Sequence, residues 1–179
     1  MKNWVVLFAP TGSEEKLVSK LKQKLNANVY LPFVPYKETP RSRKGVFTKE
    51  RKVLFPGYIF VQTEIDARSI AGNLYHDIRI SGAQRDIYKI LHYGDNKKDV
   101  ALREHERQEW MQFFGEDFTV EGSVGFIEGD AVRVTSGSLM GMESRIKKIN
   151  RHKREAVIEL DIMGAKREVC LMLEIVEKV

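Results

Sequence analysis

The stretch Phe55-Pro56-Gly57-Tyr58-Ile59-Phe60-Val61 decides how this chain is interpreted, because it places a Pro-Gly pair at the start of an apolar run. Proline restricts its own φ to about −65°, whereas glycine reaches φ values that other residues avoid. The pair therefore predicts a defined bend that holds Phe55 and Tyr58 where a partner can contact them. The alternative is a kinked edge strand without a partner, because edge strands tolerate proline.

Outward from this stretch, length and composition narrow the class of protein. The 179 residues suffice for one domain or two small ones, and the net charge of +5 is modest, so its distribution matters more than its total. No apolar run approaches the roughly 20 residues of a membrane-spanning helix, and Met1-Lys2-Asn3-Trp4 shows no signal-peptide pattern. We therefore expect a cytoplasmic protein with no membrane partner. The single cysteine, Cys170, excludes an internal disulfide, and its apolar surroundings predict a buried thiol.

Hydrophobic periodicity predicts both strands and helices on either side of the bend. Alternating Trp4, Val6 and Phe8 predict a first strand. Thr11 and Glu14 have the spacing of a capping box and predict the start of a helix. Further expected elements are an extended edge segment over 29–36, a helix over 66–75, a strand over 87–91 and a helix over 102–114.

A basic segment directly precedes the aromatic stretch. Residues 37–52 hold seven lysines and arginines and two acids, and turn signals at Pro40 and Gly45 predict a long exposed hairpin. Such a hairpin can bind upstream or non-template DNA, with Phe47 as its candidate for base stacking. The alternative is a solvated basic face without a ligand. The residues assigned to DNA are Arg41, Arg43, Lys44, Lys49, Arg51 and Lys52.

The second half of the chain predicts a small β-barrel. Residues 115–124 are acidic and contain no lysine or arginine, which predicts a flexible linker between domains at 1–114 and 125–179. Short strand-like runs over 131–134, 145–149, 156–160 and 167–173 then recur at a spacing typical of a barrel. Ile146 and Ile149 break the alternation across Lys147-Lys148, which predicts a bulge.

Motifs from both halves resemble the NusG family of transcription factors. In the first half, Trp4-Val5-Val6, the strand at 29–36 and above all residues 52–61 resemble the signature of the family's NGN domain. In the second half, residues 128–134, Glu-Gly-Asp-Ala-Val-Arg-Val, followed by Gly137 and Gly141, resemble a KOW motif. The two motifs in this order, across an acidic linker, extend the resemblance over nearly the whole chain.

This resemblance implies an α+β fold, with an N-terminal α/β sandwich of the NGN type followed by a small five-stranded SH3-like β-barrel, the KOW domain. It also implies a transcription elongation factor that binds the clamp helices of bacterial RNA polymerase through an apolar pocket. The bent aromatic segment maps onto that pocket. The residues assigned to RNA polymerase are Trp4, Phe55, Pro56, Gly57, Tyr58 and Phe60.

Two departures from the housekeeping pattern indicate a specialised relative. Where a housekeeping KOW loop reads Gly-Pro-Phe, this chain has Gly137-Ser138-Leu139-Met140, which sets it apart from relatives that contact ribosomal protein S10 or Rho. Residues 145–154 hold six fixed positive charges and no acid, and with Lys166-Arg167 they resemble the LoaP-type antiterminators, whose implied partner is a hairpin in the nascent RNA. Clustered cations suit phosphates, and a looped or distorted RNA admits side chains better than a regular A-form groove. The residues assigned to RNA are Arg145, Lys147, Lys148, Arg151, His152, Lys153, Arg154, Lys166 and Arg167.

Together these motifs predict a processive antiterminator that binds RNA polymerase and a nascent RNA hairpin. One alternative is a housekeeping factor that couples polymerase to ribosomal protein S10 or to Rho. Another is a ribosome-associated RNA-binding protein that uses the KOW barrel alone. For the basic turn, the alternative is a solvated surface with no ligand.

Catalytic signatures are weak. The histidines at 76, 92, 105 and 152 are scattered, and no glycine-rich phosphate loop or metal-binding cluster of carboxylates accompanies them. We therefore expect a monomer that is not an enzyme and that uses neither a metal nor a cofactor.

Overall fold

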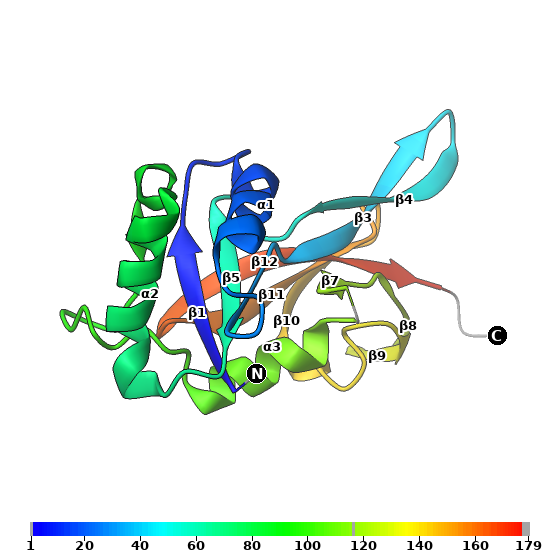
Figure 1. The fold of residues 1–179 in the computed structure, drawn as a ribbon. Helices are drawn as coiled ribbons and strands as arrows, with labels where there is room; N and C mark the ends of the chain where they lie inside the picture. The colour runs from blue at the N-terminus through cyan, green and yellow to red at the C-terminus, as the bar shows by residue number, and fades with distance from the viewer. Residues whose placement is uncertain (1, 116, 177–179) are drawn as a thin grey trace. The chain divides into compact units, whose positions relative to one another are not determined.

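The bend at residues 55–58 leads directly into β5 (Tyr58–Thr63), a central strand of a four-stranded antiparallel sheet (Figure 1). The computed structural model describes residues 2–115 and 117–176. The sheet has the order β2-β5-β1-β6, with β2 (Tyr30–Phe33), β1 (Asn3–Phe8) and β6 (Lys89–Ile90). The edge position of β2 confirms the prediction for this segment and explains why Pro32 is tolerated there.

Both faces of the two central strands are buried. Residues 5–7 of β1 and 59–61 of β5 have no exposed surface. α1 (Glu14–Lys24) and α2 (Ala67–Ser81) lie beside this sheet (Figure 1). A strand buried on both faces is apolar at successive positions, which explains the unbroken apolar run that follows the bend.

The predicted helices form, but their ends differ from the predictions. α1 has Ser13 as its N-cap, without a side-chain cap bond, so the capping box of Thr11 and Glu14 was wrong. α2 is capped by Asp66, and it continues beyond residue 75 until Gly82 ends it in the left-handed conformation. α3 (Glu104–Phe113) lies inside the predicted range. A short 3-10 helix, η1 (Gln84–Asp86), follows α2, and a second one, η2 (Glu143–Arg145), lies in the C-terminal part of the chain.

The chain divides into two compact units. The first comprises residues 1–35 and 55–107, and the second comprises residues 36–54 and 108–179. The basic hairpin therefore groups with the C-terminal strands, whereas the sequence placed it in the N-terminal domain. The domain bounds 1–114, 115–124 and 125–179 stay a prediction.

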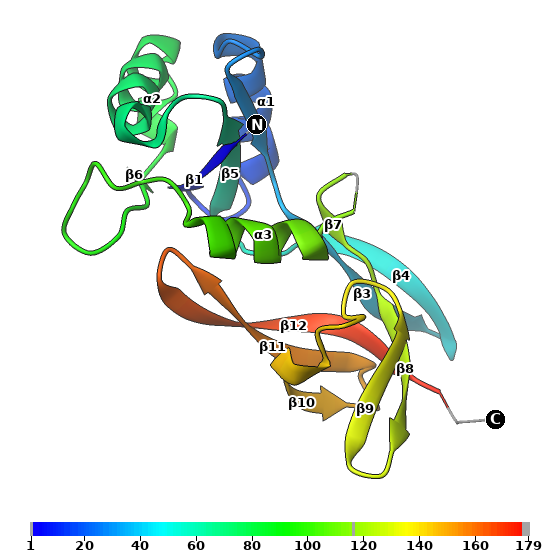
Figure 2. The same ribbon diagram turned by 90° about the horizontal axis from the view of Figure 1, so that it is seen from below.

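The second unit contains a five-stranded sheet with the order β10-β11-β12-β8-β9 (Figure 2). Its strands are β8 (Ser123–Glu128), β9 (Ala131–Ser136), β10 (Ile146–Asn150), β11 (Glu155–Ile162) and β12 (Ala165–Ile175). The pairing of β10 with β11 shifts between Ile146 and Lys148, which confirms the predicted bulge. Alternate residues of β11 from Ala156 to Ile162 are buried, which gives the sheet its apolar face. The sequence did not predict β8.

A three-stranded sheet, β4-β3-β7, completes the second unit. It consists of β3 (Tyr36–Arg43), β4 (Val46–Val53) and β7 (Thr119–Val120). β7 lies in the stretch that was predicted as a flexible linker. It forms a strand there because its backbone pairs with Tyr36 and Lys37 of β3. The buried thiol predicted at Cys170 was wrong: this residue is exposed in β12, where its neighbours Val169 and Leu171 face the core.

Candidate functional site

The aromatic bend is a tight turn with glycine at its strained position. The amide of Tyr58 donates to the carbonyl of Phe55 at 3.0 Å, and Gly57 has φ +85°. Proline followed by a glycine with positive φ is the pattern of a type II turn. A Cβ added to Gly57 would lie 2.9 Å from the carbonyl oxygen of Ala9 and 2.9 Å from the ring of Phe8. The predicted bend is therefore present, and only glycine fits it without strain.

A buried carboxylate stabilises this turn through a hydrogen bond. Oε1 of Glu14 accepts the amide proton of Gly57 at 2.6 Å, and Glu14 is only 3% exposed. The amide of Ala9 donates to the carbonyl of Gly57 at 2.8 Å, so both backbone groups of the glycine are paired. Local sequence predicts a helix cap for Glu14 and does not indicate this role. The only signal was an acid at the start of a helix, because its partner lies 43 residues away in the chain.

Aromatic rings surround the bend. The ring of Tyr58 lies 5.9 Å from that of Phe55 and 5.5 Å from that of Phe8, and Phe8 also contacts Tyr88 at 5.6 Å. Phe55 is 9% exposed, Tyr58 is half-buried, Pro56 is exposed, and Tyr88 is 65% exposed. We call Phe8, Phe55, Pro56, Tyr58 and Tyr88 the aromatic surface. Phe8 and Tyr88 were not predicted at this surface, because the fold brings them to the bend from β1 and from the segment before β6.

Two of the residues assigned to polymerase binding lie in the core instead of at this surface. Trp4 is 2% exposed and Phe60 has no exposed surface. Their rings lie 6.1 Å apart, and both pack against Phe33. These side chains support the sheet that carries the bend, and they do not present a face to a partner.

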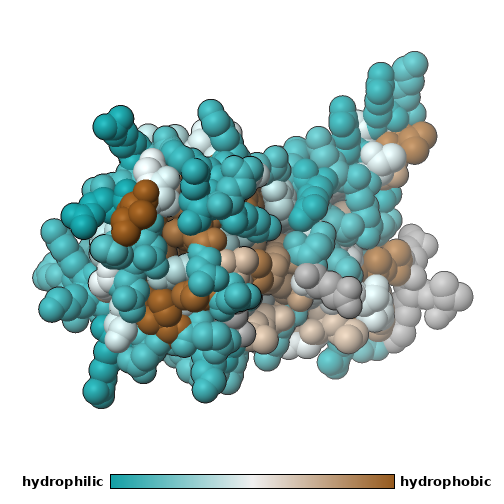
Figure 3. All heavy atoms as spheres, viewed as in Figure 1, coloured by the Kyte–Doolittle hydropathy of each residue, from teal (hydrophilic) through white to brown (hydrophobic). Residues whose placement is uncertain are grey.

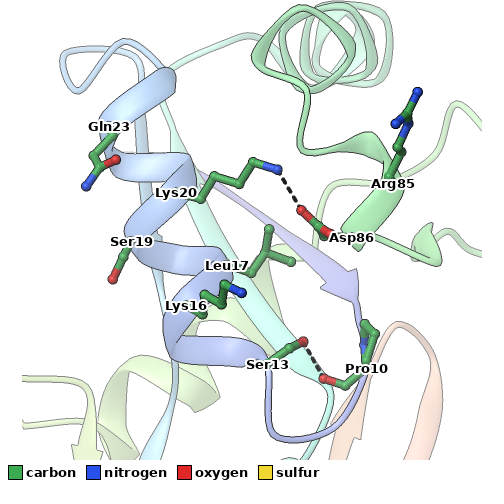
Figure 4. A pocket seen from close by; sticks show the side chains of 9 residues that line it. All are labelled: Pro10, Ser13, Lys16, Leu17, Ser19, Lys20, Gln23, Arg85 and Asp86. Carbon is green, nitrogen blue, oxygen red and sulfur yellow. Dashed lines mark hydrogen bonds and ion pairs between the residues drawn. The ribbon is translucent and has the colours of Figure 1, made fainter.

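A groove of about 650 Å³ runs along α1 in the same unit (Figure 4). Its lining residues are Pro10, Ser13, Lys16, Leu17, Ser19, Lys20, Gln23, Arg85 and Asp86. Lys20 points to Asp86 across the groove, with 2.7 Å between Nζ and the carboxylate (Figure 4). The hydrogen bond from Lys20 lowers the pKa of Asp86. This ion pair partly neutralises the positive charge of the groove.

The tip of the basic hairpin in the second unit is a two-residue turn. Lys44 and Gly45 have φ of +51° and +78°, between the paired residues Arg43 and Val46. Positive φ at both central residues is the mark of a type I′ turn, whose twist matches that of paired strands. Val46 is 62% exposed and Phe47 is 42% exposed. Hydrophobic side chains are visible among hydrophilic ones near the end of the hairpin (Figure 3).

Most cations along the hairpin already have partners. Arg41 and Lys52 each lie within 3.6 Å of Glu50, and Nζ of Lys49 is 2.8 Å from Glu38. Arg51 pairs with Asp117 at 3.4 Å, and its guanidinium lies 3.8 Å from the ring centroid of Tyr36. Within the described part of the chain, Arg43 and Lys44 are the members of the DNA-assigned set without an ion pair.

The cations assigned to RNA lie in η2, β10, the β10–β11 turn and β12, and they too divide into paired and unpaired residues. Arg145 pairs with Glu109 at 2.6 Å, Lys147 and Lys166 pair with Glu159 at 3.9 and 2.6 Å, and Arg154 pairs with Glu174 at 2.8 Å. Acids that are distant in the sequence thus neutralise part of the positive charge of residues 145–154, which contain no acid themselves. In the described ranges, the RNA-assigned residues without an ion pair are Lys148, Arg151, His152, Lys153 and Arg167.

The structure also brings the two basic regions together. The guanidinium carbon of Arg154 lies 3.7 Å from the ring centroid of Phe47, so the β10–β11 turn contacts the hairpin near its tip. From the sequence alone, these regions were expected in separate domains with separate partners. Neither residue carried a local signal for this contact.

The described residues offer neither a metal site nor a membrane-spanning helix. Among residues 2–115 and 117–176, no three His, Cys, Asp or Glu side chains are grouped so that they could hold a metal ion. Over the same residues, no helix combines the length and the apolarity needed to cross a bilayer.

Comparisons with known proteins cover most of the chain. A family model described as "Transcription termination factor nusG" matches residues 2–111. The transcription termination/antitermination protein NusG of Thermus thermophilus is 25% identical over 176 residues, which cover 93% of this chain and 92% of the relative. That of Halalkalibacterium halodurans is 22% identical over 185 residues and 99% of each chain.

One solved structure is similar along the whole fold. It is described as "Domain interaction in Thermotoga maritima NusG", and it covers 97% of this chain and 94% of that chain, with a TM-score of 0.50 and 20% identity. The likeness concerns the fold alone, and it confirms the predicted α+β class with an NGN-like part followed by a KOW-like sheet.

Proposed function

The chain belongs to the NusG family of transcription termination and antitermination factors, and from this premise we propose that it is a processive antiterminator. Proteins of this family are transcription factors that act with RNA polymerase and are not enzymes. In our proposal, the aromatic surface binds the clamp helices of the polymerase, and the basic β10–β11 turn binds a hairpin in the nascent RNA. The protein acts in the cytoplasm as a monomer.

The observation that carries this proposal is the rigid construction of the aromatic bend. Gly57 is paired through both its amide and its carbonyl, and a buried Glu14 holds it. A bend fixed in this way presents Pro56 and Tyr58 without a large ordering cost on binding. A factor that binds the closed clamp better than the open clamp shifts the polymerase toward its active state without chemistry of its own.

The RNA part of the proposal rests on the cations of the β10–β11 turn. Arg151 and Lys153 are exposed, and no carboxylate of the described residues pairs with them. Free cations can exchange their counterions for RNA phosphates, which favours binding through the entropy of ion release. The LoaP-type specialisation proposed for this chain depends on this surface.

A housekeeping role is the second candidate. The loop that follows β9 buries Leu139 completely and leaves Met140 62% exposed. An exposed apolar side chain at this loop favours a protein contact, for which ribosomal protein S10 or Rho are the partners to test. A ribosome-associated protein that uses only the KOW part is disfavoured, because such a protein has no use for the aromatic bend.

Polymerase binding by a Tyr58→Ala variant tests the proposal. An aromatic anchor at an interface typically contributes about 2 kcal/mol or more, so we expect affinity for purified bacterial RNA polymerase to fall about 30-fold. Tyr75→Ala is the matched control, because Tyr75 is 45% exposed on α2 of the same unit. Equal affinities of the two variants, with both shown to be folded, would exclude the aromatic surface as the polymerase site.

A further inference from the structure

The end of the β3–β4 hairpin and the β10–β11 turn form one contiguous surface in the second unit. Arg154 connects them, because its guanidinium lies 3.7 Å from the Phe47 ring centroid while Nη1 lies 2.8 Å from the carboxylate of Glu174. The carbonyl of Arg154 also accepts the amide proton of Leu173 at 2.9 Å. Arg154 is therefore fixed through backbone and side chain to β12, and the ring of Phe47 rests on a fixed group.

The base of the hairpin is attached to the same strands. Nζ of Lys37 donates to the carbonyl of Cys170 in β12 at 2.7 Å. The carboxylate of Glu38 accepts the amide proton of Gly122 at 2.7 Å, directly before β8. These bonds connect the base of the hairpin to the same strands that the contact at Phe47 reaches near its tip.

Free positive charge lies on both sides of this contact. Arg43 and Lys44 are exposed at the hairpin tip, and Arg151 and Lys153 are exposed at the turn. No ion pair of the described residues engages any of these four side chains. The nearby cations that do have partners use Glu50 and Glu174, so these acids are already occupied.

We propose that the hairpin tip and the β10–β11 turn form one binding surface for single-stranded nucleic acid, with Phe47 as the platform on which a base stacks. This inference rests on the RNA-binding function proposed above and extends it to a segment of unpaired strand. It also replaces the separate DNA and RNA assignments of the two basic regions with a single site.

The chemistry of a single strand fits these groups. Sequence-tolerant sites for single strands combine cations along the backbone with aromatic rings that stack on bases. Phe47 keeps 42% of its surface exposed although Arg154 covers part of the ring, and the arginine behind the ring strengthens the platform. RNA and DNA share the phosphates and the base faces that such a site recognises, so separate arms of the test distinguish them.

Fluorescence anisotropy with the full chain tests this surface. The probes are a labelled RNA strand of about 10 nucleotides, a DNA strand of the same sequence, and a blunt RNA hairpin. The paired variants are Arg43→Ala with Lys44→Ala, and Arg151→Ala with Lys153→Ala. Lys22→Ala with Lys24→Ala on α1 is the charge-matched control, because both lysines are exposed and lie in the other unit.

We expect both paired variants to weaken single-strand binding and to flatten the slope of log K against log salt by about 1.4, because each cation on a single strand contributes about 0.7. The control should change neither quantity. Phe47→Leu should weaken binding about 5-fold or more without changing the slope, since it removes stacking and no charge. Phe47→Trp should retain the affinity, which separates stacking from a merely structural role.

The outcomes separate this inference from the proposed function. If only the Arg151 pair weakens binding, or if Phe47→Leu binds as well as the native chain, the single surface is refuted while RNA binding by the turn stands. If the native chain binds neither the hairpin nor the strands, both proposals fall. A strong preference for RNA over DNA identifies the transcript as the ligand, the reverse identifies the non-template strand, and equal affinity supports a site that recognises backbone and base face alone.

Discussion

Substitution of Gly57 by alanine tests the physical basis of the aromatic bend. Gly57 has φ +85°, and a Cβ there would lie 2.9 Å from the carbonyl oxygen of Ala9, a backbone atom that cannot rotate away. A non-glycine residue in the left-handed region costs roughly 1–2 kcal/mol. Overpacking typically costs a further 1–3 kcal/mol or so, and the stiffer unfolded chain offsets about 0.4–1 kcal/mol of the total. The net loss of local stability is therefore about 2–4 kcal/mol.

Gly12→Ala is the matched control for this substitution. Gly12 has φ +87° in the same unit, but no atom lies within 4 Å of the Cβ that alanine would add. The Gly12→Ala variant should lose about 1 kcal/mol of local stability, which is the conformational cost without the clash. The difference in stability between the two variants therefore gives the energetic cost of the clash between the bend and the end of β1.

Hydrogen exchange of peptides from β1 and β5 measures this difference, because the protection of these strands reports the local free energy of opening. We expect Gly57→Ala to lose the larger part of that protection and to bind polymerase more weakly, since Phe8 must move and Tyr58 packs on it. Equal protection in the two alanine variants would refute the argument that the bend is sterically fixed.

Two further perturbations remove carboxylates that accept backbone amide protons. Glu14→Ala should destabilise the bend by about 1–3 kcal/mol, because it leaves the Gly57 amide unpaired, whereas Glu14→Gln keeps an acceptor and should lose less; exchange of the β5 amides compares them. Burial alone would raise the pKa of Glu38, but hydrogen bonds from Lys49 and from the Gly122 amide outweigh it and lower that pKa. The stabilisation by Glu38 is thus present above the unfolded pKa of about 4.3 and is lost as pH falls through the lowered folded value. When the free energy of unfolding is measured as pH falls, the Glu38→Gln variant should therefore lose less stability than the native chain. Equal losses of stability would contradict this role.

Local patterns predicted many elements of the fold, although not β7 or β8. The alternation in β11, the bulge at Ile146, the hairpin turn at Gly45 and the Pro-Gly bend each depend on neighbouring residues, so the sequence alone predicted them. The turn predicted at Pro40 was wrong, because this residue lies inside β3 and pairs with Lys49. The N-terminus of α1 was predicted less well, because Glu14 suits a capping box and also suits a distant glycine amide. Local propensity cannot choose between such partners.

The candidate sites depended on contacts that no local pattern contains. Tyr88 joins the aromatic surface only because β6 pairs with β1, and Phe47 meets Arg154 only because β3 packs along β12. The free charge of the basic turn could not be predicted from local sequence either. Residues 145–154 contain no acid, yet Glu174 and other distant acids neutralise part of their charge. The sequence therefore identified the regions, and the fold selected which side chains are free to bind.

The central claim is that the aromatic bend faces RNA polymerase, and site-specific crosslinking tests it most directly. A photoreactive amino acid in place of Pro56, which is exposed at the bend, is illuminated in the complex with bacterial RNA polymerase, and mass spectrometry maps the crosslinked peptides. The same probe in place of Asn73, exposed on α2, is the control. The account predicts crosslinks from position 56 to the clamp helices and none from position 73. Crosslinks from position 73 without any from position 56 would contradict it.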